Sequence, residues 1–563
     1  MGPFHRRDFL RAGAWLIAGA AVGRWPRVGV ATRAPLDLLL RGGRVVDGTG
    51  RTAFRADVGV RGGRIVAVGV LPDASAATLL DVSGHVVAPG FVDVHGHTDL
   101  GIFVDPAADS KVRQGVTTEV VGQDGSSVLP VSDGMREARR KRYRERYGVE
   151  IDFGGWEEFL RALTDAGLLA NFATMVGSGT VREVVLGEAD RAPDEEELAS
   201  MIRLVESARE AGAAGVSSGL EYTPNAYADP DELVALARPF ADTGLAYASH
   251  LRNEADSVEE ALAEAVAVAR RAGVAFQASH LKAQGRRNWP KAARLLETLE
   301  RTAEVGPPAR FDRYPYTAYS TGLGSLFPAW AKEDGDEAFL DRLQDPSLAA
   351  DLRAAVEEKI EMMGDWDAIQ IASVEGDAPE DAIGERLGTW AVTTGRDPYA
   401  AAVELLVASG NHASIVGHGM SEENTRRFVA HPLGAICSDA GARRSIGPLS
   451  EGTPHPRAYG SFPRVLGRYV REEEALSLEE AVRKMTSLPA SVVGLADRGT
   501  VAEGKAADIV VFDPAGALDT ATFEDPHRYP EGIPHVVVNG TLVIRDGEPT
   551  GAFPGRIATP TAS

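Results

Sequence analysis

LAYASHLRNEADSVEEALAEAVAVARRAGVAFQASH, residues 245–280, consists of two short apolar runs, each ending in a histidine, with a helical pattern between them. The runs at 245–250 and 274–280 are typical of buried β-strands. Ser257 and Glu260 have the spacing of a capping box, and apolar side chains then recur at helical intervals until Gly273. A strand, a helix and a second strand in this order predict a βαβ unit, with parallel strands and a right-handed crossover.

Similar units recur to about residue 494, and together with the motifs described below they favour an α/β barrel over an open sheet. Both ends of the chain are instead rich in short strands, from 36 to about 89 and again from 507 to 544. Asn539-Gly540 is typical of a type I′ hairpin turn. We expect the two ends to pair in one small β domain, because pairing would protect the edge strands of both.

The composition is that of a globular protein that acts on small molecules rather than on nucleic acid. The chain has 563 residues, of which 44% are apolar and 25% charged. Acidic residues outnumber basic ones by 81 to 59, whereas a nucleic-acid partner would require a basic surface. Cys437 is the sole cysteine, so no disulfide can form within the chain, and a metal site must use histidine and carboxylate ligands.

Residues 1–33 have the features of an export signal of the twin-arginine type. Arg6-Arg7 precedes an uncharged run from Ala12 to Gly23. This run is shorter than the roughly 20 apolar residues that cross a bilayer, and no other candidate span follows it. We therefore expect a periplasmic or extracellular protein without a stable membrane span. The alternative is an amphipathic leader without an export function, and the sequence leaves the oligomeric state and the cleavage site open.

Four histidines follow predicted strands. His95 and His97 come directly after the apolar run 86–93, and on an extended chain residues two apart point the same way. His250 and His280 occupy the same position in consecutive strands, and the carboxyl ends of strands carry the active site in α/β barrels. For either histidine taken singly, a structural role in packing is the better explanation. Packing does not readily explain two copies in the same register, one βα repeat apart. We therefore predict a metal site, and imidazole and carboxylate ligands suit zinc.

Asp439 ends a further apolar run, which begins at residue 435. A carboxylate beside a metal-bound water can act as a general base, because the metal lowers the pKa of that water from about 15.7 toward about 7. The alternative role of Asp439 is a helix N-cap, which is common for aspartate after a strand. With the histidines present, we predict that Asp439 is catalytic.

Residues 89–99, PGFVDVHGHTD, resemble the first strand of the amidohydrolase superfamily. Five other motifs resemble its N-acyl-D-amino-acid deacylase (D-aminoacylase) branch: Gly219–Tyr222, Ser279–Lys282, Tyr314–Tyr316, Met420–Asn424 and His455–Arg464. The resemblance covers about residues 36–550. It implies a zinc-dependent (β/α)8 TIM-type barrel that hydrolyses the amide bond of small N-acyl-D-amino acids. It also implies a β-sandwich built from both chain ends, so the expected boundaries are 1–33 (signal), 34–89 (sandwich), 90–494 (barrel) and 495–555 (sandwich).

The resemblance also implies roles for the predicted ligands. His95 and His97 match the ligands of one metal ion, and His250 and His280 match those of another, with Asp439 as the catalytic aspartate. One departure concerns the segment Gly122-Gln123-Asp124-Gly125, because the family usually has Asn-Cys-Gly there. Asp124 stands in place of a metal-binding cysteine, and we include it among the ligands because carboxylate also binds zinc. One or two zinc ions are then possible, and the alternative is that Asp124 is only a loop residue.

The resemblance assigns the substrate contacts to another set of residues. Lys282 and Arg457 match groups that hold the substrate carboxylate, with Tyr314 as a third contact and Tyr316 as the other candidate for that place. Tyr222 or the metal would stabilise the oxyanion of the transition state. An arginine pairs bidentately with a carboxylate, although Arg457 could also form only a surface ion pair.

A second departure motivates the competing hypotheses. The segment between Asp439 and Arg457 is longer than the family norm, and a loop there would overhang the site and could change substrate choice. One alternative is therefore a related amidohydrolase that acts on a cyclic amide, a carbamoyl compound or a dipeptide containing a D-amino acid. The other is a scaffold protein that binds without catalysis, which would be expected to have lost the ligands.

Overall fold

The computed structural model describes residues 35–561. The predicted twin-arginine signal at residues 1–33 lies outside this range. None of the helices within residues 35–561 combines the length and apolar character that a membrane crossing requires. The described chain has α/β architecture, which confirms the predicted fold class at that level.

Parallel strands form the centre of the molecule. One sheet has the order β17-β13-β12-β11-β10-β9 and another has the order β6-β7-β8. Only Met175 separates β8 from β9, and a parallel bridge between Gly96 and Ala440 links the ends of β6 and β17. The pairings therefore run around a ring of buried strands: β6 (Phe91–Asp93), β7 (Val116–Val121), β8 (Asn171–Thr174), β9 (Val176–Gly177), β10 (Gly215–Gly219), β11 (Ala246–His250), β12 (Ala275–Ala278), β13 (Ala309–Arg313) and β17 (Gly434–Ile436).

The βαβ unit at 245–280 has the predicted topology. β11 and β12 pair in parallel, and α8 (Val258–Ala272) connects them and ends at Gly273, which has a φ of 77°. The predicted capping box is wrong. Ser257 occupies the N-cap position, but its side chain makes no capping hydrogen bond within the described chain. The backbone N–H groups of Ala255 and Ser257 donate instead to Asn253 Oδ1 in the preceding loop, so the N–H that would bond the Glu260 side chain in a capping box already has a partner.

The two chain ends join in one nine-stranded sheet, as expected. β5 pairs with β1 on one side and with β18 on the other, and the tight turn between β19 and β20 has positive φ at both Asn539 and Gly540. The N-terminal strands are β1 (Leu36–Val45), β2 (Phe54–Arg61), β3 (Arg64–Gly69), β4 (Ala76–Asp81) and β5 (Val86–Pro89). The C-terminal strands are β18 (Ile509–Phe512), β19 (His535–Val538), β20 (Thr541–Arg545) and β21 (Glu548–Pro549).

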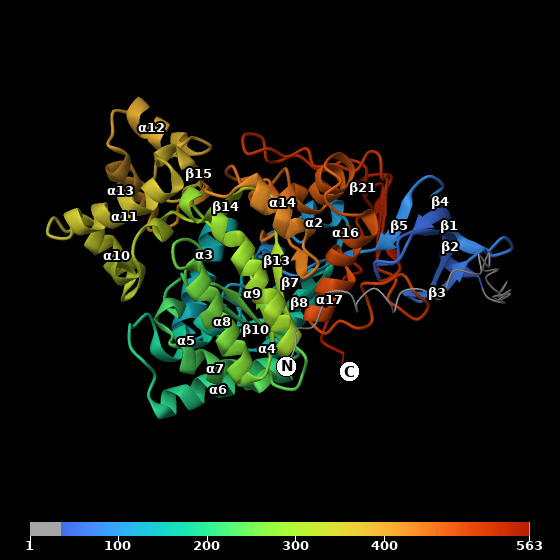
Figure 1. The fold of residues 1–563 in the computed structure, drawn as a ribbon, viewed down its shortest axis with the longest axis horizontal. Coiled ribbons are helices and arrows are strands. Elements are labelled where there is room, and N and C mark those ends of the chain that lie inside the picture. The colour runs from blue at the N-terminus through green and yellow to red at the C-terminus, as the bar shows by residue number, and fades with distance from the viewer. Residues whose placement is uncertain (1–34, 562–563) are drawn as a thin grey trace, which may run out of the picture.

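The βα units that the sequence predicts up to about residue 494 are interrupted by an insertion at residues 318–418. This insertion contains the antiparallel strands β14 (Ala318–Gly322), β15 (Ile369–Ser373) and β16 (Ser414–His418). Its helices lie at the opposite end of the molecule from β1–β5 (Figure 1): α10 (Gly335–Gln344), α11 (Ala349–Met363), α12 (Leu387–Thr393) and α13 (Pro398–Ser409). Short apolar runs between helices look alike whether their strands pair in parallel or antiparallel, so local pattern did not reveal the change.

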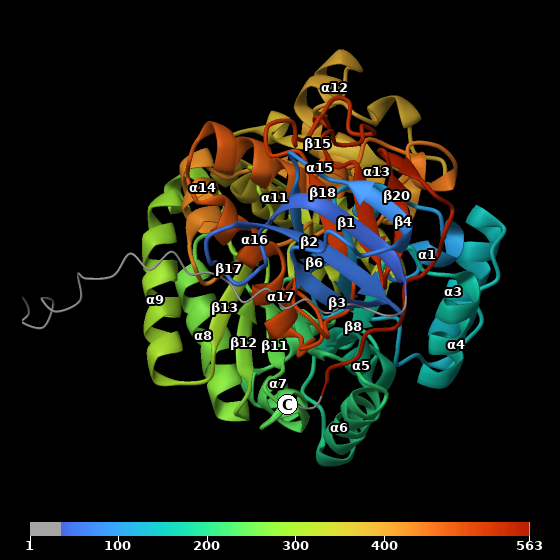
Figure 2. The same cartoon turned by 90° about the vertical axis from the view of Figure 1, so that its right-hand side faces the viewer.

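The other helices surround the ring, and Figure 2 shows α3–α9 around its outside. They are α1 (Gly101–Val104), α2 (Ser110–Arg113), α3 (Asp133–Tyr147), α4 (Trp156–Ala166), α5 (Ser178–Leu186), α6 (Glu195–Glu210), α7 (Pro230–Ala237), α9 (Ala292–Val305), α14 (Glu422–Ala430), α15 (Arg457–Arg464), α16 (Leu478–Met485) and α17 (Ser487–Val492). The last described residues return to the ring, where Ala558 donates a backbone hydrogen bond of 2.8 Å to Phe172 in β8.

Candidate active site

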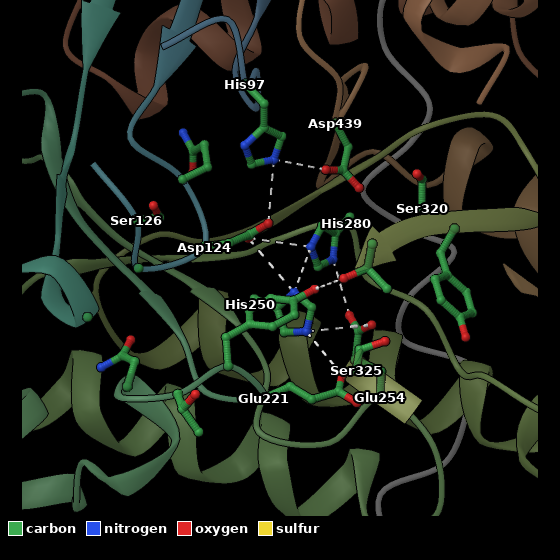
Figure 3. A pocket seen from close by; sticks show the side chains of 18 of the residues that line it. His97, Asp124, Ser126, Glu221, His250, Glu254, His280, Ser320, Ser325 and Asp439 are labelled. Carbon is green, nitrogen blue, oxygen red and sulfur yellow. Dashed lines mark hydrogen bonds and ion pairs between the residues drawn. The ribbon is translucent and has the colours of Figure 1, made fainter. Parts of the chain in front are cut away.

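All six predicted ligand and catalytic residues lie at the carboxyl ends of ring strands. They follow or end five strands of the ring: β6 precedes His95 and His97, β7 precedes Asp124, β11 ends at His250, β12 precedes His280 and β17 precedes Asp439. Figure 3 shows five of these side chains pointing toward one another, with Asp124 linked to His97, His250 and His280 and with Asp439 linked to His97. The structure thus brings together residues that span more than 340 positions of the sequence.

The distances between these side chains fit a zinc ion. His95 Nε2 and His280 Nε2 lie 3.3 and 3.4 Å from the two carboxylate oxygens of Asp124, and His97 Nε2 lies 3.1 Å from Asp439 Oδ1. Bonds of about 2.0–2.1 Å in a tetrahedral zinc site place the ligand atoms roughly 3.3 Å apart. Asp124 Oδ1 is also buried and accepts no hydrogen bond from any described residue. An oxygen in that situation suits a metal ion, because a buried acceptor without a partner is costly.

A second group of potential ligands adjoins the first. His250 Nδ1 lies 3.0 Å from His280 Nε2 and 3.9 Å from Asp124 Oδ1. On its other side, His250 Nε2 lies 3.3 Å from Glu221 Oε2. Glu254 contacts His280 Nδ1 at 3.1 Å, and His250, Glu254 and His280 form a further cluster that could hold a metal ion. Asp124 lies between the two groups and is therefore placed to bridge two ions.

Three of these residues have a strained backbone conformation. Asp124, His280 and Asp439 have φ values of 53°, 33° and 51°, in the left-handed region that non-glycine residues rarely adopt. Such conformations persist where the surrounding structure holds them, and they concentrate at functional sites. Glycine is required between the first two histidines for a different reason, because a Cβ at Gly96 would lie 2.1 Å from Glu119 Oε1.

Asp312 in β13 orients two of the histidines, and sequence reasoning missed it. Its Oδ1 accepts a hydrogen bond of 2.7 Å from the backbone N–H of His280 and lies 3.3 Å from His95 Nδ1. Gln277 Nε2 donates to the other oxygen at 2.9 Å. A carboxylate behind a ligating histidine fixes the ring and raises its basicity. One feature of the sequence could have identified Asp312. It lies near the end of the next predicted strand after the two strands that end at His250 and His280.

The electrostatics of the site favour a cation. Burial alone would raise the pKa of Asp439, but the guanidinium of Arg457 and the imidazole of His280 hold it well below its usual range. Burial lowers the pKa of His97, yet hydrogen bonds to Asp124 and Asp439 raise it to about 9. The carboxylates therefore stay ionised, and the imidazoles would take up protons where a divalent cation could lie instead.

The site opens into a cavity of about 460 Å³ whose wall includes Tyr222, Lys282 and Arg457. The ring of Tyr314 is fully buried and lies 4.6 Å from the Arg457 guanidinium carbon, and its hydroxyl has no hydrogen-bond partner among the described residues. Tyr316 directs its hydroxyl elsewhere, toward Asp519 at 3.3 Å. Of the two tyrosines, Tyr314 is therefore the one that contacts a residue of this cavity wall.

Arg457 and Lys282 are buried in ion pairs, so the alternative of a surface ion pair for Arg457 is wrong. Arg457 Nη1 donates to Asp439 Oδ2 at 2.6 Å, and its side chain is 6% exposed. Lys282 Nζ donates to Glu254 Oε1 at 2.6 Å and lies 2.7 Å from His280 Nδ1. Both cations thus touch the predicted ligand and catalytic groups directly as well as facing the cavity.

Sequence reasoning also missed Glu221, Glu254 and Lys359, which all line the cavity. Glu254 lies four residues after His250, a spacing that could have drawn attention to it. Lys359 Nζ contacts Glu221 Oε1 at 2.7 Å but comes from α11 in the insertion. No motif near Lys359 indicated that this helix reaches the site.

Comparisons with known proteins show the family to which the chain belongs. The amidohydrolase family model matches residues 447–544. The chain is 38% identical to an N-acyl-D-glutamate deacylase of Alcaligenes xylosoxydans xylosoxydans, over 94% of this chain and 97% of that protein. It is 36% identical to a D-aminoacylase of the same organism, over 94% and 99%. A crystal structure of N-acyl-D-glutamate deacylase from Bordetella bronchiseptica, complexed with zinc and a phosphonate inhibitor, aligns with a TM-score of 0.80 and 35% identity, over 93% of this chain and 100% of that chain.

The fold, the histidines and carboxylates at the strand ends and these relatives define a metal-dependent hydrolase, and the chain belongs to the amidohydrolase family. Within that family, the extent of the similarity places it in the N-acyl-D-amino-acid deacylase (D-aminoacylase) branch.

Proposed function

We propose that the protein hydrolyses the amide bond of N-acyl-D-amino acids with zinc as the cofactor. The observation that carries this proposal is the convergence of four histidines, Asp124 and Asp439 at one mouth of the strand ring, at distances that suit zinc. Relatives named for N-acyl-D-amino-acid deacylation support the substrate class. The intact ligand set argues against a scaffold without catalysis.

His95, His97, Asp124, His250 and His280 would hold the ion or ions. A bound zinc ion supplies a Lewis acid for the amide carbonyl and lowers the pKa of a water molecule. Asp124 reaches both groups of histidines, so this arrangement supports one or two ions. With a carboxylate at position 124, the site also binds harder metal ions more readily than a site with cysteine there would.

Asp439 would move the proton in the reaction. Its Oδ1 faces His97, and its Oδ2 is held by Arg457, so the carboxylate is fixed in both position and ionised state. It would take a proton from the attacking water and deliver that proton to the amine nitrogen as the C–N bond breaks. The products are then a carboxylate from the acyl group and a D-amino acid.

Three residues of the cavity wall would position the substrate. Lys282 and Arg457, with Tyr314 packed behind Arg457, provide positive charge for the carboxylate of the amino acid. The hydroxyl of Tyr222 lies 3.2 Å from Thr321 Oγ1 and would donate to the developing oxyanion. These assignments place the amino-acid part of the substrate on the Lys282 side of the metal ligands.

We also propose that the ring is a (β/α)8 TIM-type barrel formed within residues 90–494. The parallel pairings and the Gly96–Ala440 bridge support closure of the ring. Segments 34–89 and 495–555 would form the small β-sandwich, and two apolar clusters associated with the nine-stranded sheet support that description.

The proposed reaction predicts activity on one enantiomer. The test is a panel of matched N-acetyl-D- and N-acetyl-L-amino acids together with cyclic imides, assayed with protein of known zinc content. We expect the D-enantiomers to be hydrolysed about a hundredfold faster or more, because two fixed contacts and the metal define the chirality. Preferential turnover of cyclic imides, or equal rates for both enantiomers, would contradict the proposal.

We propose in addition that residues 1–33 direct export through the twin-arginine route to the periplasm or beyond. The paired arginines and the short apolar run support this. Replacing Arg6 and Arg7 by lysine in the full chain should leave the protein in the cytoplasmic fraction. An unchanged distribution between fractions would contradict the proposal.

A further inference from the structure

A second hollow of about 330 Å³ adjoins the metal-ligand cluster. It shares His97, Ser320, Asp439 and Arg457 with the first cavity, so the two hollows meet at the predicted catalytic groups. Lys282 belongs only to the first cavity, whereas the second extends under the long segment between Asp439 and Arg457. That segment contributes Arg443, and the catalytic role proposed above makes no use of it.

Arginines dominate the charge of the second hollow, and most of them are compensated. Arg142 contacts Glu375 at 3.0 Å, and Arg146 contacts both Glu375 and Glu451. Arg457 is paired with Asp439. Four guanidinium groups therefore face three carboxylates, and the hollow has an excess of one positive charge.

Arg443 carries this excess charge. No carboxylate within residues 35–561 forms an ion pair with its guanidinium, and no hydrogen bond from its side chain is made to the described chain. Burial lowers the pKa of Arg443, and the nearby Tyr459, Tyr147 and Glu451 offset this effect only in part. A half-buried guanidinium in a hollow of this size provides a site for one anionic group.

The backbone around Arg443 is held firmly, which fixes the base of its side chain. The N–H of Arg443 donates to Ser110 Oγ at 2.9 Å, and its carbonyl accepts from the N–H of Ser110 at 3.1 Å. The next two residues are also anchored, since Arg444 contacts Asp105 at 3.4 Å and Ser445 donates its N–H to Tyr529. Binding therefore requires little ordering of the loop, which favours affinity.

The two hollows correspond to the two halves of an amide substrate. A trans amide places its acyl and amine substituents on opposite sides of the C–N bond, and the reacting carbon must lie at the metal ligands. The amino-acid part is assigned to the first cavity by Lys282. The acyl part is then directed into the second hollow, toward Arg443.

We propose that Arg443 binds an anionic group at the far end of the acyl chain, so that the preferred substrates carry a dicarboxylic acyl group such as succinyl or glutaryl. This inference rests on the proposed N-acyl-D-amino-acid hydrolysis and specifies its acyl substrate class.

The test compares acyl groups of equal length on one D-amino acid, with zinc-loaded protein. N-succinyl is matched with N-succinamoyl, and N-glutaryl with its terminal amide, so that only the distal charge differs. We expect kcat/KM to favour one of the carboxylates by about 10- to 100-fold, the range for hydrogen bonds to charged groups. Arg443→Gln should abolish this preference and change kcat/KM for the N-acetyl compound less than about twofold. Arg444→Gln is the matched control on the same loop and should keep the preference.

Each result has a defined meaning. A wild-type preference below about twofold for both acyl pairs would overturn the proposal even if Arg443→Gln failed to fold. Survival of the preference in Arg443→Gln would also overturn the proposal. So would a loss of activity on N-acetyl-D-glutamate in that variant, because this result would place the side chain of the amino acid, rather than the acyl group, in the second hollow. Turnover of N-acetyl-D-amino acids separates this failure from that of the proposed function. If no N-acyl-D-amino acid is hydrolysed, both proposals fall.

Discussion

The ends of the ring strands and the insertion at 318–418 contribute to the same cavity in different ways. The strand ends supply buried groups in fixed and partly strained conformations, such as His95 and Asp439. The insertion supplies wall residues such as Ser320 and Lys359, which are only partly buried. We propose that the strand ends carry the catalytic groups, whereas the insertion adds wall residues that adjust the fit of the substrate beside Lys282 and Arg457.

The largest effect is expected at the ring, for Asp439→Asn. Asparagine keeps the shape of the side chain but cannot take the proton, so kcat should fall by on the order of 10²–10⁴-fold while zinc remains bound. Steady-state kinetics together with zinc analysis of the purified variant measure both quantities. Near-normal turnover would show that Asp439 does not take part in the reaction, and it would contradict the assignment of catalysis to the strand ends.

A smaller effect is expected at Asp124, where the ligand type can be exchanged. Asp124→Ala should weaken zinc binding by about tenfold or more, because both histidine groups lose a shared carboxylate. Asp124→Cys should retain zinc and activity, since thiolate is an ordinary zinc ligand. Competition with a chelator of known affinity measures this series. Identical zinc affinity in all three proteins would show that Asp124 is only a loop residue.

The smallest effect is expected in the insertion, for Lys359→Met. Loss of the contact with Glu221 should change KM by about three- to tenfold with kcat nearly unchanged, because the substitution affects the wall and leaves the strand-end groups in place. Glu357→Gln on the same helix α11 is the matched control, since Glu357 contacts Arg353 on the surface. A large fall in kcat for Lys359→Met would contradict the proposal that catalysis depends on the ring and not on the insertion.

The difference between the ring and the insertion also explains which parts of the site could be predicted from the sequence. His250 and His280 were found because strand ends repeat in register, and the ring geometry then requires them to meet. Asp124 was found only through its resemblance to a family motif, since a lone aspartate in a glycine-rich turn has no distinctive pattern. The pairing of both chain ends followed from their composition, because each end would otherwise expose unpaired strands.

The insertion and its contacts could not be predicted in this way. The apolar runs of β15 and β16 alternate with helices just as ring strands do, and only long-range pairing distinguishes them. Lys359 reaches Glu221 across 138 positions, which no local spacing encodes. The capping box of Ser257 and Glu260 fails for a similar reason, because the Ser257 N–H that Glu260 would accept is bonded to Asn253 in the preceding loop.

The most direct test of the central claim is anomalous diffraction at the zinc edge from crystals of the zinc-loaded protein. We expect a peak within about 2.0–2.2 Å of side-chain atoms of His95, His97 and Asp124, with a second peak, if present, beside His250 and His280. A peak at another place in the molecule, with these histidines left without metal, would contradict the account.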